Sequence, residues 1–151
     1  FAEFNNRVPN SYLLLLGTGE LEDEIHHYVN DRGLSDRVIF TGSVANVGDF
    51  YSAMDVFVLP SLYEGFPVVS IEVQAAGLPL YASDNIDRSI DVAQGAHFLS
   101  VKEEPLHWAN EILKEGVSTR YLKNIEALRA ACYDINIEAS SLENLYRNMD
   151  R

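Results

Sequence analysis

An apolar strand that runs into a turn rich in glycine and proline, and then into a short helix, limits the folds open to this chain. The strand is Val56 to Leu59, and the helix is predicted to end at Gly77. Between them, Pro67 is expected in the first helical turn, where its missing N–H leaves no hydrogen bond unmade. A strand, a loop and a helix in this order are typical of α/β domains.

The rest of the chain repeats this alternation. Apolar runs predict strands at residues 12–16, 38–40, 80–82 and 98–99, and helical periodicity predicts helices at 20–32, 50–54, 104–115, 119–133 and 137–149. Segment 86–92 fits either a helix or an extended chain. Residues 12–16 are apolar throughout, as in a strand buried on both faces of a parallel sheet. The predicted fold is therefore an α/β, doubly wound parallel sheet of Rossmann-like type.

Composition narrows the function. The 151 residues fit a single domain, and a net charge of -12 argues against nucleic acid and against an electrostatic anchor on anionic lipid. The sequence has no apolar run long enough for a membrane span, and its first residues are not expected to be a signal peptide. Cys132 is the single cysteine, which excludes an internal disulfide and fits a reducing cytosol. Its helical, apolar surroundings predict a small core residue.

Two carboxylates flank the predicted start of the central helix. Glu64 lies in the loop, and Glu72 lies eight residues later, about five positions into the helix. The backbone N–H groups of Gly65, Phe66 and Val68 stand at the helix N-terminus, where unpaired amides and the helix dipole favour phosphate. The pattern predicts an anion site with a carboxylate on either side.

These residues resemble a known family. Glu64 and Glu72 match the E-x7-E signature of retaining glycosyltransferases of the GT-B type and GT4 class. The match extends over some twenty positions, which include Asp55, Pro60-Ser61, Glu64-Gly65-Phe66, Glu72 and Ala75-Ala76-Gly77-Leu78-Pro79. Pro67 and Gln74 are most similar to the branch that builds bacterial capsular and exopolysaccharides.

The resemblance implies a role for each residue. Glu64 is expected to be the catalytic residue, with a carboxylate that accepts hydrogen bonds from hydroxyls of the donor sugar and does not act as a glycosidase-style acid. Glu72 is expected to bind the ribose hydroxyls. The amides of Gly65, Phe66 and Val68 are expected to face the phosphates. Many relatives carry glycine where this chain has Pro67, so one expected amide is missing.

Two further loops are candidates for donor binding. Gly17 and Gly19 follow the first strand, but Glu22 stands at the third position of a dinucleotide fingerprint, which makes an NAD site improbable. A tight turn from strand to helix remains one interpretation, and the resemblance implies the other, a loop that faces the donor's pyrophosphate. By the same resemblance, Ser43 and Val44 lie beside the nucleotide base.

Metal and nucleophilic sites are not predicted. The four histidines, His26, His27, His97 and His107, show no metal-ligand spacing, and no Ser-His-Asp or Cys-His arrangement is readable. Enzymes of the GT-B type are known to work without a bound metal. No cofactor is expected beyond the substrate, a nucleoside diphosphate sugar, with uridine diphosphate the favoured carrier.

As a whole, residues 1–151 resemble a single nucleotide-sugar-binding domain, the C-terminal half of a GT-B glycosyltransferase. The resemblance implies a longer cytoplasmic enzyme, peripheral to the inner membrane, whose N-terminal domain binds a saccharide acceptor. That domain, and the first strand and helix of this half with their basic residues, are expected to be missing, so this chain alone is expected to be inactive. Two alternatives stay open: a non-catalytic binding or scaffold module of the same fold, and a sugar-nucleotide epimerase.

Overall fold

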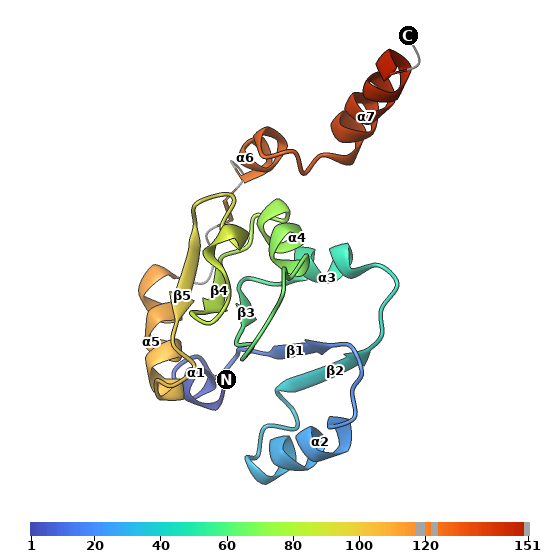
Figure 1. Ribbon diagram of the computed structural model, residues 1–151. Coiled ribbons are helices and arrows are strands. Elements are labelled where there is room, and N and C mark those ends of the chain that lie inside the picture. The colour runs from blue at the N-terminus through green and yellow to red at the C-terminus, as the bar shows by residue number, and fades with distance from the viewer. Residues whose placement is uncertain (117–119, 122–123, 150–151) are drawn as a thin grey trace. The chain divides into compact units, whose positions relative to one another are not determined.

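The computed structural model describes residues 1–116, 120–121 and 124–149. The chain divides into two compact units (Figure 1). The first comprises residues 1–50 and 103–116, and the second comprises residues 51–102 and 117–151.

The first unit is built on two parallel strands, β1 (Leu13–Leu16) and β2 (Val38–Gly42). The helix α2 (Glu22–Asp31) connects them, and α1 (Ala2–Asn5) packs against α5 (Pro105–Glu115). Leu13 pairs with Val38, and the register shifts between Leu15 and Leu16. Parallel strands with a helical connection confirm the α/β prediction for this part of the chain.

Helix α2 lies within the predicted range of 20–32, beginning two residues later and ending one residue earlier. Three acidic residues fill its first turn, and Gly33 follows its last turn with a φ of 66°. The Gly33 N–H donates to the Asn30 carbonyl and the Leu34 N–H to the Val29 carbonyl, which is a Schellman motif. Of the apolar residues of α2 only Val29 is buried. Tyr28 is exposed, and the guanidinium carbon of Arg32 lies 4.6 Å from the centre of its ring.

The expectation that the first strand is buried on both faces is wrong. All four residues of β1 are only half-buried. Among the described strands, β1 pairs with β2 alone, so the sheet of the first unit has two strands. The continuous apolar run predicted the strand correctly, but the strand is less buried than the run indicated.

The second unit holds a three-stranded parallel sheet in the order β3-β4-β5. The strands are β3 (Phe57–Leu59), β4 (Leu80–Ser83) and β5 (Ala96–Leu99), and β4 lies in the middle with all four residues buried. Helix α4 (Val69–Ala75) connects β3 to β4 and packs against β4 and α6 (Asn124–Ala130). The core is formed by Val73, Leu78, Leu80, Tyr81, Ala82, Ile86 and Ile90.

The chain has further helices besides those that connect the strands. Helix α3 (Val47–Ala53) spans the boundary of the two units, and the ambiguous segment 86–92 contains a 3₁₀ helix, η1 (Arg88–Ile90). Helix α7 (Ile135–Met149) has no buried residue. The helix predicted for residues 119–133 is shorter in the structure, where α6 is the helical part and the described residues 120–121 and 131–133 are not helical. Positions 119, 122 and 123 lie outside the described residues.

Cys132 is not the core residue that its neighbours predicted. It is exposed, follows α6 and has a φ of 66°. The Cys132 N–H donates to the Arg129 carbonyl and the Tyr133 N–H to the Leu128 carbonyl, so Cys132 occupies the left-handed position of a Schellman motif. The helix therefore ends before Cys132, and the thiol does not follow the buried face of Leu128.

Candidate functional site

The loop of residues 60–68 leads from β3 into α4 and is open to solvent over much of its length. Leu62 and Tyr63 are 77% and 84% exposed, whereas Pro67 is buried. Helix α4 begins at Val69, so the expectation that Pro67 lies in the first helical turn needs correction. The Pro67 carbonyl instead accepts hydrogen bonds from the N–H and the hydroxyl of Ser70, at 2.9 and 2.7 Å. Pro67 thus closes the tight turn that precedes the helix.

Three backbone amides of this loop are available to a ligand. Within the described part of the chain, the N–H groups of Gly65, Phe66 and Val68 donate to no other group. All three residues are exposed. Unpaired amides before a helix suit an anion, because they direct positive charge outward.

Glu64 is held inside this exposed loop by a neighbour. The Ser61 hydroxyl donates a hydrogen bond of 2.7 Å to Glu64 Oε1. The second oxygen, Oε2, has no partner among the described residues, and the side chain is half-buried. The carboxylate is therefore oriented and still has an acceptor to offer.

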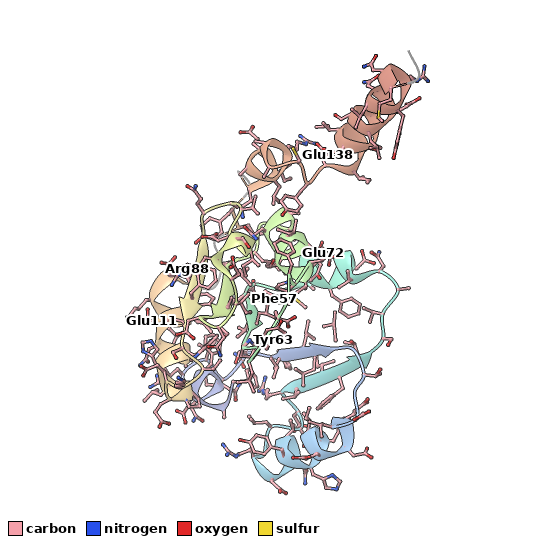
Figure 2. The ribbon with its side chains drawn as sticks, in the orientation of Figure 1. Phe57, Tyr63, Glu72, Arg88, Glu111 and Glu138 are labelled. Carbon is pink, nitrogen blue, oxygen red and sulfur yellow. The ribbon has the colours of Figure 1, made fainter. Side chains whose placement is uncertain are left out.

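Glu72, the fourth residue of α4, shows the same arrangement. The Tyr51 hydroxyl donates to Glu72 Oε2 at 2.7 Å, and within the described residues Oε1 has no partner. Burial, together with this hydrogen bond and the nearby Glu72 charge, raises the pKa of Tyr51. Figure 2 shows Glu72 on α4. Sequence periodicity placed Tyr51 only within the helix predicted for residues 50–54, so its hydroxyl contact was not predicted.

Buried polar contacts fix α4 in its unit. The amide nitrogen of Gln74 donates to the Ser70 and Ile90 carbonyls at 2.9 and 2.7 Å, and its oxygen accepts from the Ala93 N–H at 2.9 Å. Gln74 is 2% exposed. The bonds to Ile90 and Ala93 tie the helix to η1 and to the segment that follows it, so the backbone that carries Glu72 has little freedom to shift.

Arg120 joins the ends of α3 and α4. Its Nη1 donates to the Ala76 carbonyl at 2.9 Å, and its Nη2 lies 3.1, 2.8 and 2.8 Å from the carbonyl oxygens of Tyr51, Ser52 and Met54. A guanidinium at helix C-termini satisfies free carbonyls and opposes the dipole charge. Sequence patterns did not identify Arg120, because its partners lie 44 to 69 residues away.

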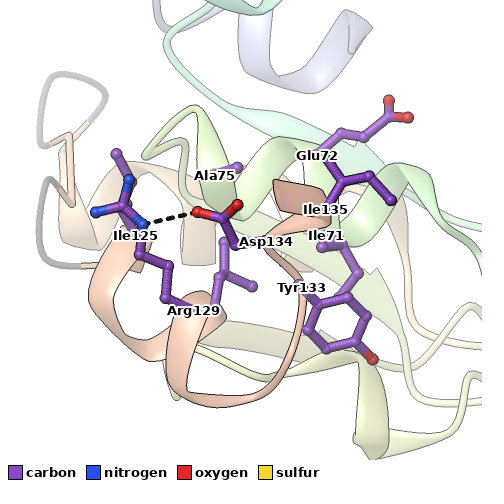
Figure 3. A pocket seen from close by; sticks show the side chains of 9 residues that line it. Ile71, Glu72, Ala75, Ile125, Arg129, Tyr133, Asp134 and Ile135 are labelled. Atoms are coloured by element: carbon purple, nitrogen blue, oxygen red, sulfur yellow. Dashed lines mark hydrogen bonds and ion pairs between the residues drawn. The ribbon is translucent and has the colours of Figure 1, made fainter. Parts of the chain in front are cut away.

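An apolar groove of about 400 Å³ lies beside this helix in the second unit. Its lining comes from α4, α6 and the start of α7: Ile71, Glu72, Ala75, Ile125, Leu128, Arg129, Tyr133, Asp134 and Ile135. An ion pair of 3.0 Å joins Arg129 to Asp134 in the groove. Figure 3 shows the Glu72 carboxylate directed away from this pair. The groove was not predicted from the sequence.

The remaining candidates belong to the first unit and gather at the carboxyl ends of its two strands. The Gly17 N–H donates to the Gly42 carbonyl at 2.8 Å, so the loop of Gly17 and Gly19 and the loop of Ser43 and Val44 begin side by side. Gly17 has a φ of 111°, which a residue with a side chain rarely adopts. A hollow of about 200 Å³ adjoins this loop, lined by Leu15, Leu16, Gly17, Gly19, Glu22, Ile25 and Phe40.

Two general properties follow from the described residues. Over residues 1–116, 120–121 and 124–149, no three His, Cys, Asp or Glu side chains gather closely enough to hold a metal ion. Within the same ranges, no helix combines the length and hydrophobicity needed to cross a membrane.

A family model and two curated proteins match the sequence. The model, described as "Glycosyl transferases group 1", covers residues 1–114. The chain is 36% identical over 148 residues to the "Putative glycosyltransferase EpsF" of Bacillus subtilis, which covers 96% of this chain and 38% of that protein. It is 38% identical over 81 residues, 53% of this chain and 21% of the relative, to the Escherichia coli "UDP-Gal:alpha-D-GlcNAc-diphosphoundecaprenol alpha-1,3-galactosyltransferase". The chain thus spans well under half the length of these relatives.

Solved structures share the fold. Sucrose-phosphate synthase from Thermosynechococcus elongatus superposes with a TM-score of 0.75 and 27% identity over 98% of this chain and 41% of that one. The structure of Anabaena HepE in complex with UDP gives a TM-score of 0.68 over 92% of this chain and 42% of that one. At 22% identity the latter likeness concerns the fold alone. These neighbours have the GT-B fold, which agrees with the predicted Rossmann-like, C-terminal half of a GT-B enzyme.

Proposed function

Because the chain belongs to the group 1 glycosyltransferase family, we propose that it is the nucleotide-sugar-binding domain of a retaining, GT4-class enzyme. Its relatives are named as glycosyltransferases, and the one from E. coli is named for a sugar linked to diphosphoundecaprenol. The proposed reaction moves a sugar to a growing bacterial polysaccharide or lipid-linked saccharide. The acceptor would be bound by a further domain of a longer cytoplasmic enzyme that is peripheral to the inner membrane.

The arrangement of Glu64 and Glu72 carries this proposal. Each carboxylate has one oxygen held by a hydroxyl of the chain and one oxygen that no described residue engages, which leaves it to a ligand. In the proposed complex Glu64 accepts from hydroxyls of the donor sugar, and Glu72 accepts from the ribose. Charge-assisted hydrogen bonds of this kind are roughly twice as strong as neutral ones.

The loop between the two acids would bind the diphosphate. Gly65, Phe66 and Val68 each offer an N–H that donates to none of the described residues, and Pro67 has no N–H. These amides would stabilise the leaving diphosphate, because they are already oriented before negative charge develops on it. Uridine diphosphate is the proposed carrier. The E. coli relative is named for a UDP-linked donor, and the HepE structure contains UDP.

The glycine loop and the neighbouring residues of the first unit are proposed as further donor contacts. Gly17 and Gly19 would approach the pyrophosphate. Neither carries a side chain, and the space beside each is open, because a Cβ at either position would meet nothing within 4 Å. Ser43 is exposed and Val44 half-buried, so both can meet a base at the ends of β1 and β2. The proposed chemistry needs no metal or cofactor.

Calorimetric titration of the chain with UDP, GDP and their sugars tests the proposal. Glu72→Ala should weaken UDP binding by roughly 10- to 100-fold, because a charge-assisted hydrogen bond is lost. Net charge alone predicts the opposite result, because removing a carboxylate from a chain of net charge -12 would strengthen the binding of a diphosphate. Glu126→Ala, an equivalent change at an exposed position of α6, is the control for net charge. UDP binding that is unchanged by Glu72→Ala would overturn the assignment of Glu72.

A further inference from the structure

Tyr51 is a buried phenol whose polar end meets a carboxylate at the surface. The residue is 5% exposed, and its ring packs edge-on against Phe57 at 6.2 Å between ring centroids. Its hydroxyl donates to Glu72 Oε2 at 2.7 Å. A ring packed in this way cannot turn out of the core, so its hydroxyl oxygen is held in a fixed position beside Glu72.

Glu72 gains a fixed orientation from this contact. It lies on an exposed position of α4, where a glutamate normally samples several rotamers. The hydroxyl of Tyr51 engages Oε2 and leaves Oε1 without a partner among the described residues. One oxygen is therefore anchored, and the other has a defined position from which to accept a hydrogen bond.

The two backbones that carry this pair are themselves tied together. Arg120 bridges the carbonyls of Tyr51 and Ala76, which belong to the ends of α3 and α4. Gln74 ties the buried side of α4 to Ile90 and Ala93 through two hydrogen bonds. The hydrogen bond between Tyr51 and Glu72 is thus held from both helices, as a preorganised binding group requires.

We propose that Tyr51 is the positioning residue for Glu72, and that its hydroxyl presents Glu72 Oε1 to the ribose hydroxyls of the nucleotide. This inference rests on the proposed function, because it assigns a second residue to the same site. Tyr51 does not touch the nucleotide. Because Tyr51 already holds the glutamate in one orientation, the side chain loses less conformational entropy when the ligand binds.

A double-mutant cycle tests this role. UDP affinity is measured by calorimetry for the unaltered chain, Tyr51→Phe, Glu72→Ala and the double variant. Tyr51→Phe removes one oxygen and keeps the ring, so the fold is expected to persist, which the melting temperature checks. Affinity should fall about three- to tenfold in Tyr51→Phe, in keeping with one hydrogen bond. The double variant should bind no more weakly than Glu72→Ala, because Tyr51 acts only through Glu72.

The control is Tyr146→Phe, the same chemical change at an exposed position of α7. It should leave UDP affinity unaltered. UDP lacking the ribose 2′- or 3′-hydroxyl supplies a second readout. Tyr51→Phe should weaken the binding of UDP more than it weakens the binding of the deoxy analogue that lacks the hydroxyl bound by Glu72. A general loss of stability would not produce this difference.

The outcomes separate the two proposals. If the unaltered chain binds neither UDP nor GDP, the proposed function fails and this inference fails with it. If the unaltered chain binds UDP but Tyr51→Phe binds it equally well, the positioning role is wrong and the proposed function stands. Additive losses in the double variant would also contradict the positioning role. A lower melting temperature with unchanged affinity would show that Tyr51 serves stability alone.

Discussion

The Ser61 hydroxyl donates a 2.7 Å hydrogen bond to Glu64, three residues along the same loop. Its length equals that of the bond from Tyr51 to Glu72, although Tyr51 comes from a helix 21 residues away. The two acids are thus oriented by different means, one by a local contact and the other by a tertiary contact. Each leaves one carboxylate oxygen open, and this asymmetry motivates separate tests of the two positions.

Glu64→Gln should separate recognition of the sugar from recognition of the nucleotide. We expect the affinity for a UDP-sugar to fall by roughly 10-fold or more while the affinity for UDP stays nearly constant, because Glu64 is proposed to contact only the sugar. Ser61→Ala should cause a smaller loss in the same direction, since it frees the carboxylate without removing it. Calorimetry with UDP and a UDP-sugar measures both. An equal loss for the two ligands would contradict the assignment.

Arg120→Met should destabilise the second unit. Removal of the guanidinium leaves carbonyls at the ends of α3 and α4 without their donor, and we expect a loss of about 1.5–3 kcal/mol in the free energy of unfolding. Methionine keeps most of the side-chain length. Urea unfolding monitored by circular dichroism gives the value, and Arg7→Met, at an exposed position of the first unit, is the matched control. A value near zero would show that water replaces the guanidinium without cost.

Tyr51 should make the protein sensitive to alkali. Its pKa in the folded chain is raised, first by burial and then by Glu72, so the folded state holds the phenolic proton more tightly than the unfolded state does. This contribution to stability is fully present below about pH 10, the ordinary pKa of tyrosine, and is lost as the pH rises above it. Unfolding free energies measured between pH 8 and 11 should fall more steeply for the unaltered chain than for Tyr51→Phe. Parallel curves would contradict the expectation.

The thiol of Cys132 should be accessible and yet slow to react. Cys132 is exposed, and a hydrogen bond to Glu138, together with the charge of that carboxylate, raises its pKa. Because the thiolate is the nucleophile, alkylation by iodoacetamide at pH 8 should be slower than for a free thiol. Glu138→Gln should accelerate it, and Glu143→Gln, further along α7, should not. A rate that is insensitive to Glu138 would show that the contact is not maintained in solution.

Local order was predictable because its causes lie within a few residues. Gly33 and Gly77 were correctly predicted to end their helices, since glycine adopts the left-handed conformation that both positions require. Cys132 occupies the same left-handed position in the same motif, but cysteine has no preference for that position from which the motif could be predicted. Pro67 was placed two residues too far into α4, because the tight turn stabilised by Ser70 precedes the helix.

The sequence by itself determined the alternation of parallel strands and helices, the family, and the two carboxylates around the start of α4. These depend on periodicity and on residues close together in the chain. Tertiary structure alone decided that Tyr51 anchors Glu72 and that Arg120 joins the ends of α3 and α4. Such contacts bring together groups 21 to 69 residues apart, and their energy depends on direction and burial, which a linear pattern does not encode.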